Sequence, residues 1–383
     1  MNNSKFDLFL DFVKSLYPAE TPVPLHAPRF LGKEKEYLCE CIETTFVSYV
    51  GKFVTDFENH IKTLTGVKNA VAMVNGTAAL HMALLAAEVK SGEIVITQAL
   101  TFAATAAGIR HASAEPAFVD VDKETLGMSP NSLKRYLVEH CISKTDGLYN
   151  KASGRKIAAV MPMHTFGHPV RIDEIVQICK EYNLLLVEDA AESLGSTYKG
   201  KHTGTFGRAA ILSFNGNKAV TTGGGGMLIT DDDALAERAR FISTTAKRKH
   251  RWEFFHDEVG YNLRMPNVNA AIGCAQMEYF DKIIANKRST AEKYKRFFEN
   301  QDIKFFSEPD FSFSNYWLNV ILLASKEERD KFLAYTNDNE VQTRPIWTLM
   351  SKLPPYKDCS RTELTNSEWL EDRVVNIPSS VRV

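Results

Sequence analysis

Two stretches, IAAVMPM at residues 157–163 and LLLVED at residues 184–189, decide the fold class. Both have the near-continuous apolar composition of a strand that is buried on both faces. The segment between them, residues 171–182, has helical spacing. A strand, a helix and a second strand in succession form the unit from which parallel sheets are built. The sequence therefore predicts an α/β fold with a mostly parallel sheet.

The same alternation continues on both sides of this unit. Further strands are expected at residues 69–74, 93–97, 117–121, 209–214 and 226–230, and helices at residues 78–88 and 102–111. Helices should then cover both faces of the sheet. Sheets of this kind bind their ligands at the carboxyl ends of the strands, so the residues that follow each strand are the candidates for function.

The pattern changes after Pro266. A long helix is expected over residues 268–287, then a short strand over residues 317–323 and turn-rich segments. We therefore divide the chain into an N-terminal helical extension (1–24), a large α/β domain (25–265) and a small α+β domain (266–383). The extension has apolar residues at helical spacing, which predicts a helix that packs on the body of the chain or on a partner subunit.

Composition excludes several functional classes. The 383 residues carry 46 lysines and arginines against 47 aspartates and glutamates, so no overall charge favours nucleic acid or an anionic membrane. No apolar run is long enough to span a membrane. The six cysteines form no C-x-x-C pair, and no metal site is signalled. With no signal peptide evident, these features predict a cytoplasmic protein that binds neither membrane nor nucleic acid.

Polar residues follow three of the expected strands. Asn75-Gly76-Thr77-Ala78 opens a helix, where free N–H groups suit one phosphate, although a plain tight turn explains the same residues. Asp189 ends an apolar strand, either as a helix N-cap or as a carboxylate that faces a cationic ring nitrogen or a metal. Lys218 follows another buried strand among small residues, where its amine would be desolvated. Together, a phosphate site, an aspartate and a lysine predict a pyridoxal-phosphate (PLP) pocket.

Three longer motifs make this chain resemble the DegT/DnrJ/EryC/StrS family of PLP-dependent sugar aminotransferases. They are EDAAESLG (188–195), SFNGNK (213–218) and GYNLRM (260–265). The resemblance implies the aspartate-aminotransferase fold (fold type I). LHAPRF (25–30), VGKFV (50–54) and TTGGGG (221–226) resemble a narrower branch that acts on UDP-linked sugars. The implied reaction transfers an amino group from L-glutamate to C4 of a UDP-linked 4-keto-6-deoxy-N-acetylhexosamine, for bacterial surface glycans.

The resemblance also assigns roles to single residues. Lys218 would bind the cofactor covalently and then move a proton, and Asp189 would pair with the pyridine nitrogen. Phe102 would stack on the ring, although a core phenylalanine is an equally simple reading. Glu192 would lie near the phenolic oxygen of the cofactor and would need a proton or a water bridge there. The residues implied in phosphate binding are Gly76, Thr77, Ala78 and Ser213.

A homodimer with shared active sites is implied by two further residues. In the family, Asn262 reaches the phosphate of the neighbouring subunit and Arg264 approaches the substrate nucleotide; without the resemblance, a buried structural asparagine would be expected. The basic run at residues 247–251 is interpreted as a solvated loop, or as a loop that attracts the pyrophosphate of the substrate. His164 is interpreted as a hydrogen-bonded structural histidine.

Two alternatives stay open on the sequence alone. The first keeps the fold and the amino transfer and changes the substrate to a GDP- or dTDP-linked 4-keto or 3-keto hexose. The second is a PLP-binding regulatory protein without catalytic activity. The motifs do not determine the nucleotide, the substituent at C2 of the sugar or the configuration of the new amine.

Overall fold

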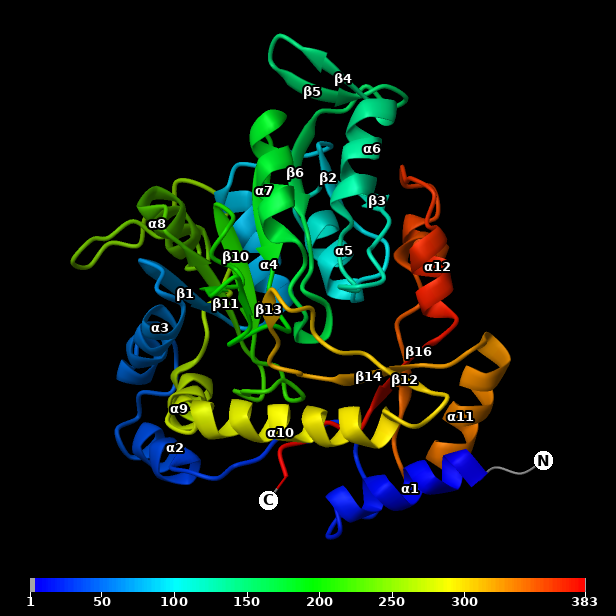
Figure 1. Cartoon of the computed structure of the whole chain (residues 1–383). Coiled ribbons are helices and arrows are strands. Elements are labelled where there is room, and N and C mark those ends of the chain that lie inside the picture. The colour runs from blue at the N-terminus through cyan, green and yellow to red at the C-terminus, as the bar shows by residue number, and fades with distance from the viewer. Residues whose placement is uncertain (1–3, 383) are drawn as a thin grey trace.

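The computed structural model describes residues 4–382, and its centre is a seven-stranded sheet with the order β1-β11-β10-β7-β6-β2-β3 (Figure 1). Its strands are β1 (Asn69–Met73), β2 (Ile94–Gln98), β3 (Glu115–Val119), β6 (Ile157–Met161), β7 (Leu185–Asp189), β10 (Ala209–Ser213) and β11 (Gly226–Thr230). All neighbours from β10 to β3 are parallel, and β11 is antiparallel to both of its neighbours. The prediction of a mostly parallel sheet is confirmed.

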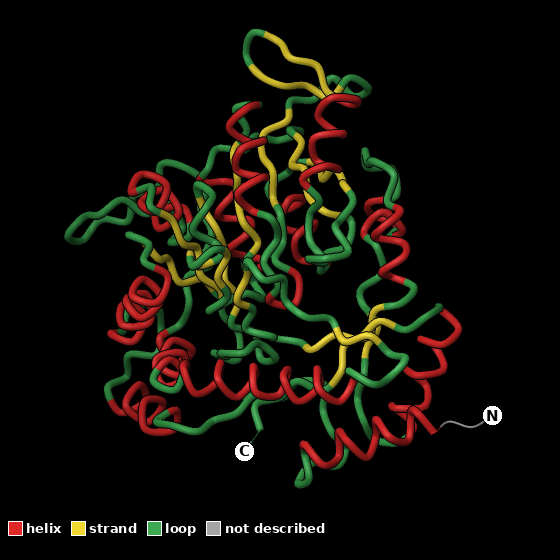
Figure 2. Tube along the Cα trace, viewed as in Figure 1, coloured by secondary structure: helices red, strands yellow, loops and turns green. Residues whose placement is uncertain are grey.

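Helices cover both faces of this sheet (Figure 2). Successive side chains of a strand point to opposite faces, and both faces are apolar here. In β1, for example, Val71 and Met73 join the core under α4 and α8, whereas Ala70 and Ala72 join the core under α3 and α9. The helices around the sheet are α3 (Lys52–Thr65), α4 (Gly76–Ala86), α5 (Ala103–His111), α6 (Pro130–His140), α7 (Ile172–Glu181), α8 (Asp233–Ile242) and α9 (Asn267–Met277).

A second, four-stranded sheet lies beside the first and has the order β12-β14-β16-β15. Its strands are β12 (Lys304–Phe305), β14 (Asn319–Leu322), β15 (Arg344–Pro345) and β16 (Val374–Ile377). It packs with α1 (Ser4–Leu16), α10 (Phe280–Phe298) and α11 (Lys326–Asp338) around a shared apolar core. The predicted N-terminal helix therefore exists and packs on its own chain, through Phe6, Phe9, Leu10, Val13 and Leu16.

The prediction of one helix over residues 268–287 is wrong, because α9 ends at Met277 and α10 begins at Phe280. The start of α10 shares a core with α9, but the rest of α10 leaves it. Ala271 and Cys274 of α9 pack on α3, whereas Tyr294 and Phe298 of α10 reach the core of the second sheet. Two helices that follow different directions satisfy both contacts. Neither proline nor glycine marks the change, since residues 278 and 279 are Glu and Tyr.

The remaining elements are short and peripheral. They include a projecting hairpin, a three-stranded sheet and two further helices, and no helix among residues 4–382 is long and apolar enough to cross a membrane. Their bounds are α2 (Glu34–Glu43), β4 (Cys141–Lys144), β5 (Gly147–Asn150), β8 (Thr197–Tyr198), β9 (Lys201–His202), β13 (Ser312–Phe313) and α12 (Thr365–Glu371), with single turns at Thr165–Gly167, Met350–Lys352 and Pro354–Tyr356.

Candidate active site

A cavity of about 610 Å³ opens between the two sheets, at the carboxyl ends of β1, β7 and β10. Seven of the predicted site residues line it: Gly76, Thr77, Phe102, Asp189, Glu192, Ser213 and Lys218. The side of the second sheet adds residues that the sequence did not single out: Trp317, Arg344, Trp347 and Asn376. Trp347 lies beside Phe102, with 5.8 Å between the ring centroids. Three separate strand ends therefore converge on one cavity, as expected for this class of sheet.

The start of α4 forms one end of the cavity. The Asn75 side chain caps the helix by accepting a hydrogen bond from the backbone N–H of Ala78 at 2.8 Å. A Cβ atom on Gly76 would lie only 3.1 Å from Cβ and 3.2 Å from Oγ of Ser213, so glycine lets the helix start approach the serine hydroxyl closely. Gly76, Thr77 and Ser213 can thus receive one phosphate together. Ala78 does not line the cavity, and its N–H serves the cap.

Asp189 is the last residue of β7 and is buried. Its Oδ2 accepts a hydrogen bond from the Thr105 hydroxyl at 2.7 Å, and its Oδ1 accepts one from the N–H of Ala191 at 3.2 Å. Turns rather than a helix follow it, so the alternative of a helix N-cap is wrong. Burial raises the pKa of this carboxyl, so its charged form is costly unless a cationic group lies beside it. A protonated pyridine nitrogen is such a group.

Lys218 lies in the loop after β10, with only 12% of its side chain exposed. Its Nζ is 3.1 Å from Oε1 of Glu192 and 3.6 Å from the centroid of the Trp317 ring. The amine is therefore shielded from water on both sides. A desolvated amine at the wall of the cavity has the environment that covalent bonding to a carbonyl carbon requires.

Glu192 is buried beside this amine. Its Oε2 accepts a hydrogen bond from the N–H of Phe166 at 2.8 Å, while Oε1 faces Lys218. Burial raises the pKa of Glu192 to about 7, and the charge of Lys218 opposes that rise. The carboxyl can therefore hold a proton near neutral pH, which is what a glutamate facing a phenolic oxygen needs.

This titration predicts a pH-dependent difference between the protein and its Glu192→Gln variant. From pH 4.5 to about 7 the folded protein keeps a proton on Glu192 that the unfolded chain releases, so stability falls as the pH rises through this range. Glutamine does not titrate. Urea unfolding at pH 5 and pH 8 should therefore show the variant gaining roughly 2.5 kcal/mol relative to the original protein. An equal difference at both pH values would contradict a raised pKa.

Asn262 and Arg264 do not line the cavity of their own subunit. Asn262 is exposed and pairs with Thr244 in an isolated bridge, so the reading of a buried structural asparagine is wrong. The Arg264 guanidinium is buried and donates to Glu58 at 2.7 Å and to the carbonyl of Ala72 at 2.9 Å. Burial lowers its pKa, and Glu58 opposes this. Within one subunit Arg264 thus serves an internal ion pair.

His164 is a structural residue, as predicted. It is fully buried and its Nδ1 accepts from the N–H of Val170 at 3.2 Å. Its Nε2 therefore carries the proton and donates to Glu188 at 3.0 Å. Glu188 also accepts from backbone N–H groups of residues 204, 206 and 207. This network ties the end of β7 to the following loop and leaves Asp189 to face the cavity.

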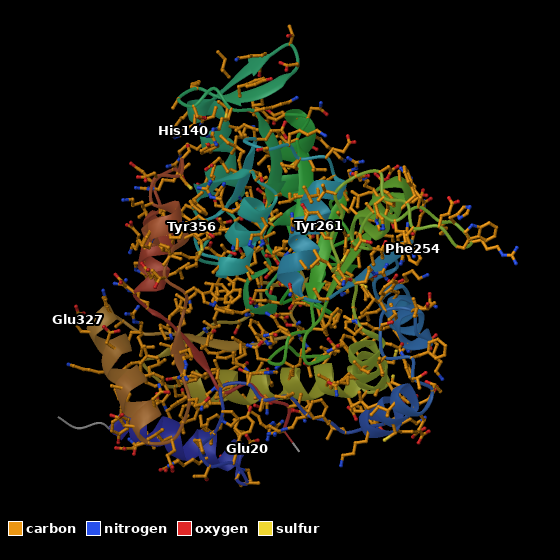
Figure 3. All side chains as sticks on the ribbon, turned by 180° about the vertical axis from the view of Figure 1, so that it is seen from behind. Glu20, His140, Phe254, Tyr261, Glu327 and Tyr356 are labelled. Atoms are coloured by element: carbon orange, nitrogen blue, oxygen red, sulfur yellow. The ribbon has the colours of Figure 1, made fainter. Side chains whose placement is uncertain are left out.

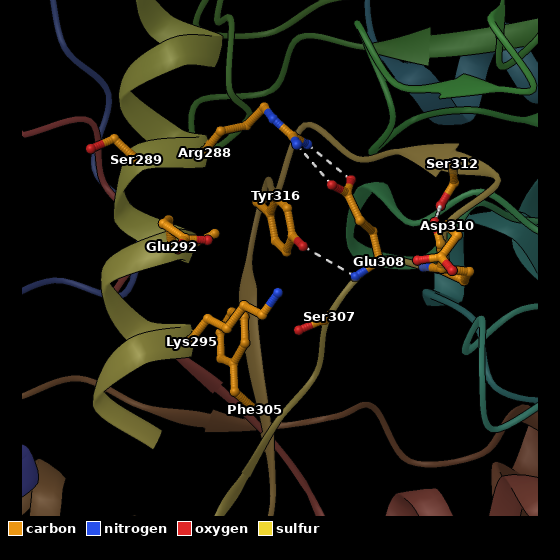
Figure 4. Close-up of a pocket in the computed structure, with 12 residues that line it drawn as sticks. Arg288, Ser289, Glu292, Lys295, Phe305, Ser307, Glu308, Asp310, Ser312 and Tyr316 are labelled. Atoms are coloured by element: carbon orange, nitrogen blue, oxygen red, sulfur yellow. Dashed lines mark hydrogen bonds and ion pairs between the residues drawn. The ribbon is translucent and has the colours of Figure 1, made fainter. Parts of the chain in front are cut away.

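A second cavity, of about 540 Å³, lies between α10 and residues 305–316 (Figure 4). The Arg288 guanidinium and the Glu308 carboxylate neutralise each other there, at 2.7 Å. The other lining groups carry both signs of charge, with Glu292, Lys295 and Asp310 around the rim. None of the predicted site residues reaches this cavity, so it is not a second candidate for the reaction.

Comparison with known proteins identifies relatives over nearly the whole chain. A sequence model of the DegT/DnrJ/EryC1/StrS aminotransferase family matches residues 30–383. GDP-perosamine synthase of Escherichia coli O157:H7 is 37% identical over 357 residues, which cover 93% of each protein. The putative pyridoxal phosphate-dependent aminotransferase EpsN of Bacillus subtilis (strain 168) is 38% identical and covers 87% of this chain and 83% of its own length.

Solved structures agree with the fold. The sugar aminotransferase CalS13 from Micromonospora echinospora superposes with a TM-score of 0.81 at 25% identity, over 93% of this chain and 94% of its own. The PLP form of the putative sugar aminotransferase Spr1654 from Streptococcus pneumoniae gives a TM-score of 0.84 at 20% identity, over 94% of each chain. The arrangement of the two sheets is therefore that of fold type I.

Proposed function

Since this chain belongs to the DegT/DnrJ/EryC1/StrS aminotransferase family, whose members depend on PLP, we propose that it transfers an amino group from L-glutamate to C4 of a nucleotide-linked 4-keto-6-deoxy sugar. One observation carries the proposal. Asp189, Lys218 and the expected phosphate site around Gly76 and Ser213 all line one cavity, although they lie at the ends of three different strands. PLP needs a phosphate site at one end, a lysine for its aldehyde carbon and a carboxylate beside its ring nitrogen.

Each residue has a separate task in this proposal. Bound PLP would supply an electron sink for the negative charge that develops on the carbon that bears the amino group. Asp189 keeps the pyridine nitrogen protonated, and Gly76, Thr77 and Ser213 hold the phosphate. Lys218 would bind the cofactor through its amine, and the amine, once released, would move the proton. Glu192, as a carboxylic acid, donates a hydrogen bond to the phenolic oxygen. Phe102 covers one side of the ring.

We propose a UDP-linked N-acetylhexosamine as the substrate, on the basis of the LHAPRF, VGKFV and TTGGGG motifs. A GDP-linked 4-keto-6-deoxy sugar is the second candidate. It is favoured by the similarity to GDP-perosamine synthases of Escherichia coli O157:H7, Vibrio cholerae and Caulobacter vibrioides, at 37%, 33% and 32% identity. The chemistry at C4 is the same in both cases, so only the nucleotide and the C2 substituent separate them.

A substrate panel tests the proposal. The purified protein is incubated with L-glutamate and UDP-, GDP- or dTDP-linked 4-keto-6-deoxy sugars, and products are analysed by mass spectrometry and proton NMR. The proposal expects a new amine at C4 and the highest kcat/KM with the UDP sugar. A preference for the GDP sugar would select the second candidate. Amination at C3, or of none of the sugars, would contradict the reaction itself.

We further propose that two copies of the chain form the working enzyme. Apolar side chains are exposed in two places, and a partner would cover them. The first place is the stretch from residue 30 to residue 50, with Phe30, Ile42, Phe46, Val47 and Val50. The second is the projecting loop 247–259, with Trp252, Phe254, Phe255 and Val259; Figure 3 shows Phe254 on this loop, away from the body of the molecule.

The shared site predicts complementation between inactive variants. Asn262 is exposed and lies outside the cavity of its own subunit, which suits a residue that completes the phosphate site of the partner. Mixed Lys218→Ala and Asn262→Ala subunits should regain activity, because one of the two sites in each heterodimer is intact. Native mass spectrometry verifies that heterodimers form. If they form without activity above that of the parents, Asn262 acts within its own subunit.

A further inference from the structure

The indole ring of Trp317 lies directly against the amine of Lys218. Trp317 precedes β14 and only 5% of it is exposed. Its ring centroid is 3.6 Å from Nζ of Lys218, and its Nε1–H donates a hydrogen bond to the carbonyl of Asn217 at 2.7 Å. The ring therefore contacts the amine, and the N–H holds the backbone immediately before it. Both contacts depend on where the main chain at residue 317 lies.

That main chain is held by a second lysine, Lys287 of α10, which is 1% exposed. Its Nζ donates to the carbonyl of Trp317 at 3.0 Å and to the carbonyl of Ser379 at 2.7 Å, and it lies 3.0 Å from Nε2 of His26. These three partners come from the N-terminal segment, the entry to β14 and the C-terminal segment. One amine thus joins three distant parts of the chain, and one of them, Trp317, lines the cavity.

A buried lysine in such a place is costly. Its three partners are neutral, because burial and the charge of Lys287 lower the pKa of His26 far below its usual value. Burial likewise lowers the pKa of Lys287 to about 7. A methionine would fill the same space without desolvating an amine. The benefit of lysine at this position is therefore its set of hydrogen bonds, which no apolar side chain can make.

We propose that Lys287 is a positioning residue for Lys218: it holds the main chain of Trp317, whose indole in turn holds the Asn217 carbonyl and the Lys218 amine. The inference rests on the proposed role of Lys218 as the lysine that reacts. Whenever Lys218 is not bonded to the cofactor, its amine then lies between Glu192 and the Trp317 ring. His26, part of the LHAPRF motif, belongs to the same support.

The labelling rate of the Lys218 amine measures this positioning directly, in protein that holds neither substrate nor cofactor. In the cofactor-free protein, a limiting amount of acetic anhydride labels lysines at rates that mass spectrometry follows peptide by peptide. Lys287→Met and Trp317→Leu should each raise the labelling rate of Lys218 about fivefold, the effect of losing one partly desolvated cation–π contact. Lys293→Met, an exposed position on the same helix, is the matched control and should leave the rate unchanged.

Activity gives a second readout. Lys287→Met should lower kcat about tenfold and leave the KM for glutamate unchanged, since no substrate contact is lost. Lys287→Gln keeps a donor without the charge and should recover part of kcat. It also replaces Lys287→Met if that variant does not fold, as judged by circular dichroism and thermal unfolding.

The outcomes separate this inference from the proposed function. Folded Lys287→Met and Trp317→Leu variants with unchanged Lys218 labelling and unchanged kcat would overturn the positioning role, whatever the substrate is. If Lys218 itself proves not to be the cofactor lysine, labelling still responds to Lys287, while the cofactor adduct is found on another residue. In that case the proposed function fails and the support by Lys287 remains.

Discussion

Replacing Lys218 by alanine should abolish amino transfer. Turnover should fall by at least about 10⁴-fold, because the variant loses both the amine that binds the cofactor and the base that moves the proton. We expect the purified protein to be yellow and to absorb in the near-visible, and the variant should lose this absorbance. The fold should survive, because the Lys218 side chain contacts only Glu192 and the Trp317 ring through its amine, and its removal opens no gap in the apolar core.

The control for this variant is Lys293→Ala, an exposed lysine on α10 that should retain full turnover and absorbance. Circular dichroism and size-exclusion chromatography establish that Lys218→Ala is folded. A folded variant that still transfers amino groups at the original rate would remove Lys218 from the chemistry.

Asp189→Asn has the second-largest expected effect. The carboxylate, which we propose keeps the ring nitrogen of PLP protonated, lies in a buried site, where an electrostatic contact is worth several kcal/mol. Asparagine has the same shape but no charge, so kcat should fall about a thousandfold and PLP should dissociate more readily. Steady-state kinetics and dialysis against cofactor-free buffer measure the two effects.

Two comparisons make the Asp189 result specific. Asp173→Asn, on the exposed side of α7, should change neither kcat nor retention of the cofactor. Thr105→Val removes the hydroxyl that donates to Asp189 at 2.7 Å and should cause a smaller loss than Asp189→Asn. A loss of only a few-fold for Asp189→Asn would mean that the carboxylate serves the local turn and not the cofactor.

Local patterns sufficed to predict the large sheet and several residues that line one cavity at its edge. Strands such as 157–161 and 185–189 are apolar runs whose side chains are buried on both faces, and polar residues directly after them must lie at one edge of a parallel sheet. For that reason Asp189, Lys218 and the start of α4 could be assigned to one site before their positions in space were known.

The other wall of the cavity could not be predicted in this way. Trp317, Arg344, Trp347 and Asn376 reach it only because the second sheet folds back on the first, and no local motif marks that contact. Lys287 lies in an ordinary charged stretch of α10, so its burial follows from packing between segments more than 90 residues apart. The break between α9 and α10 has the same origin, because α10 leaves the core that it shares with α9 and reaches the core of the second sheet, and no helix-breaking residue marks the change.

The most direct test of the account is to find which lysine bonds to the cofactor. Borohydride reduction makes that bond permanent, and digestion followed by mass spectrometry locates it on one peptide. We expect a pyridoxyl adduct on Lys218 alone, and its loss in Lys218→Ala. Lys287 is the natural competitor, since it is buried nearby and its pKa is lowered to about 7. An adduct on Lys287, with Lys218 unmodified, would contradict the assignment of the catalytic lysine.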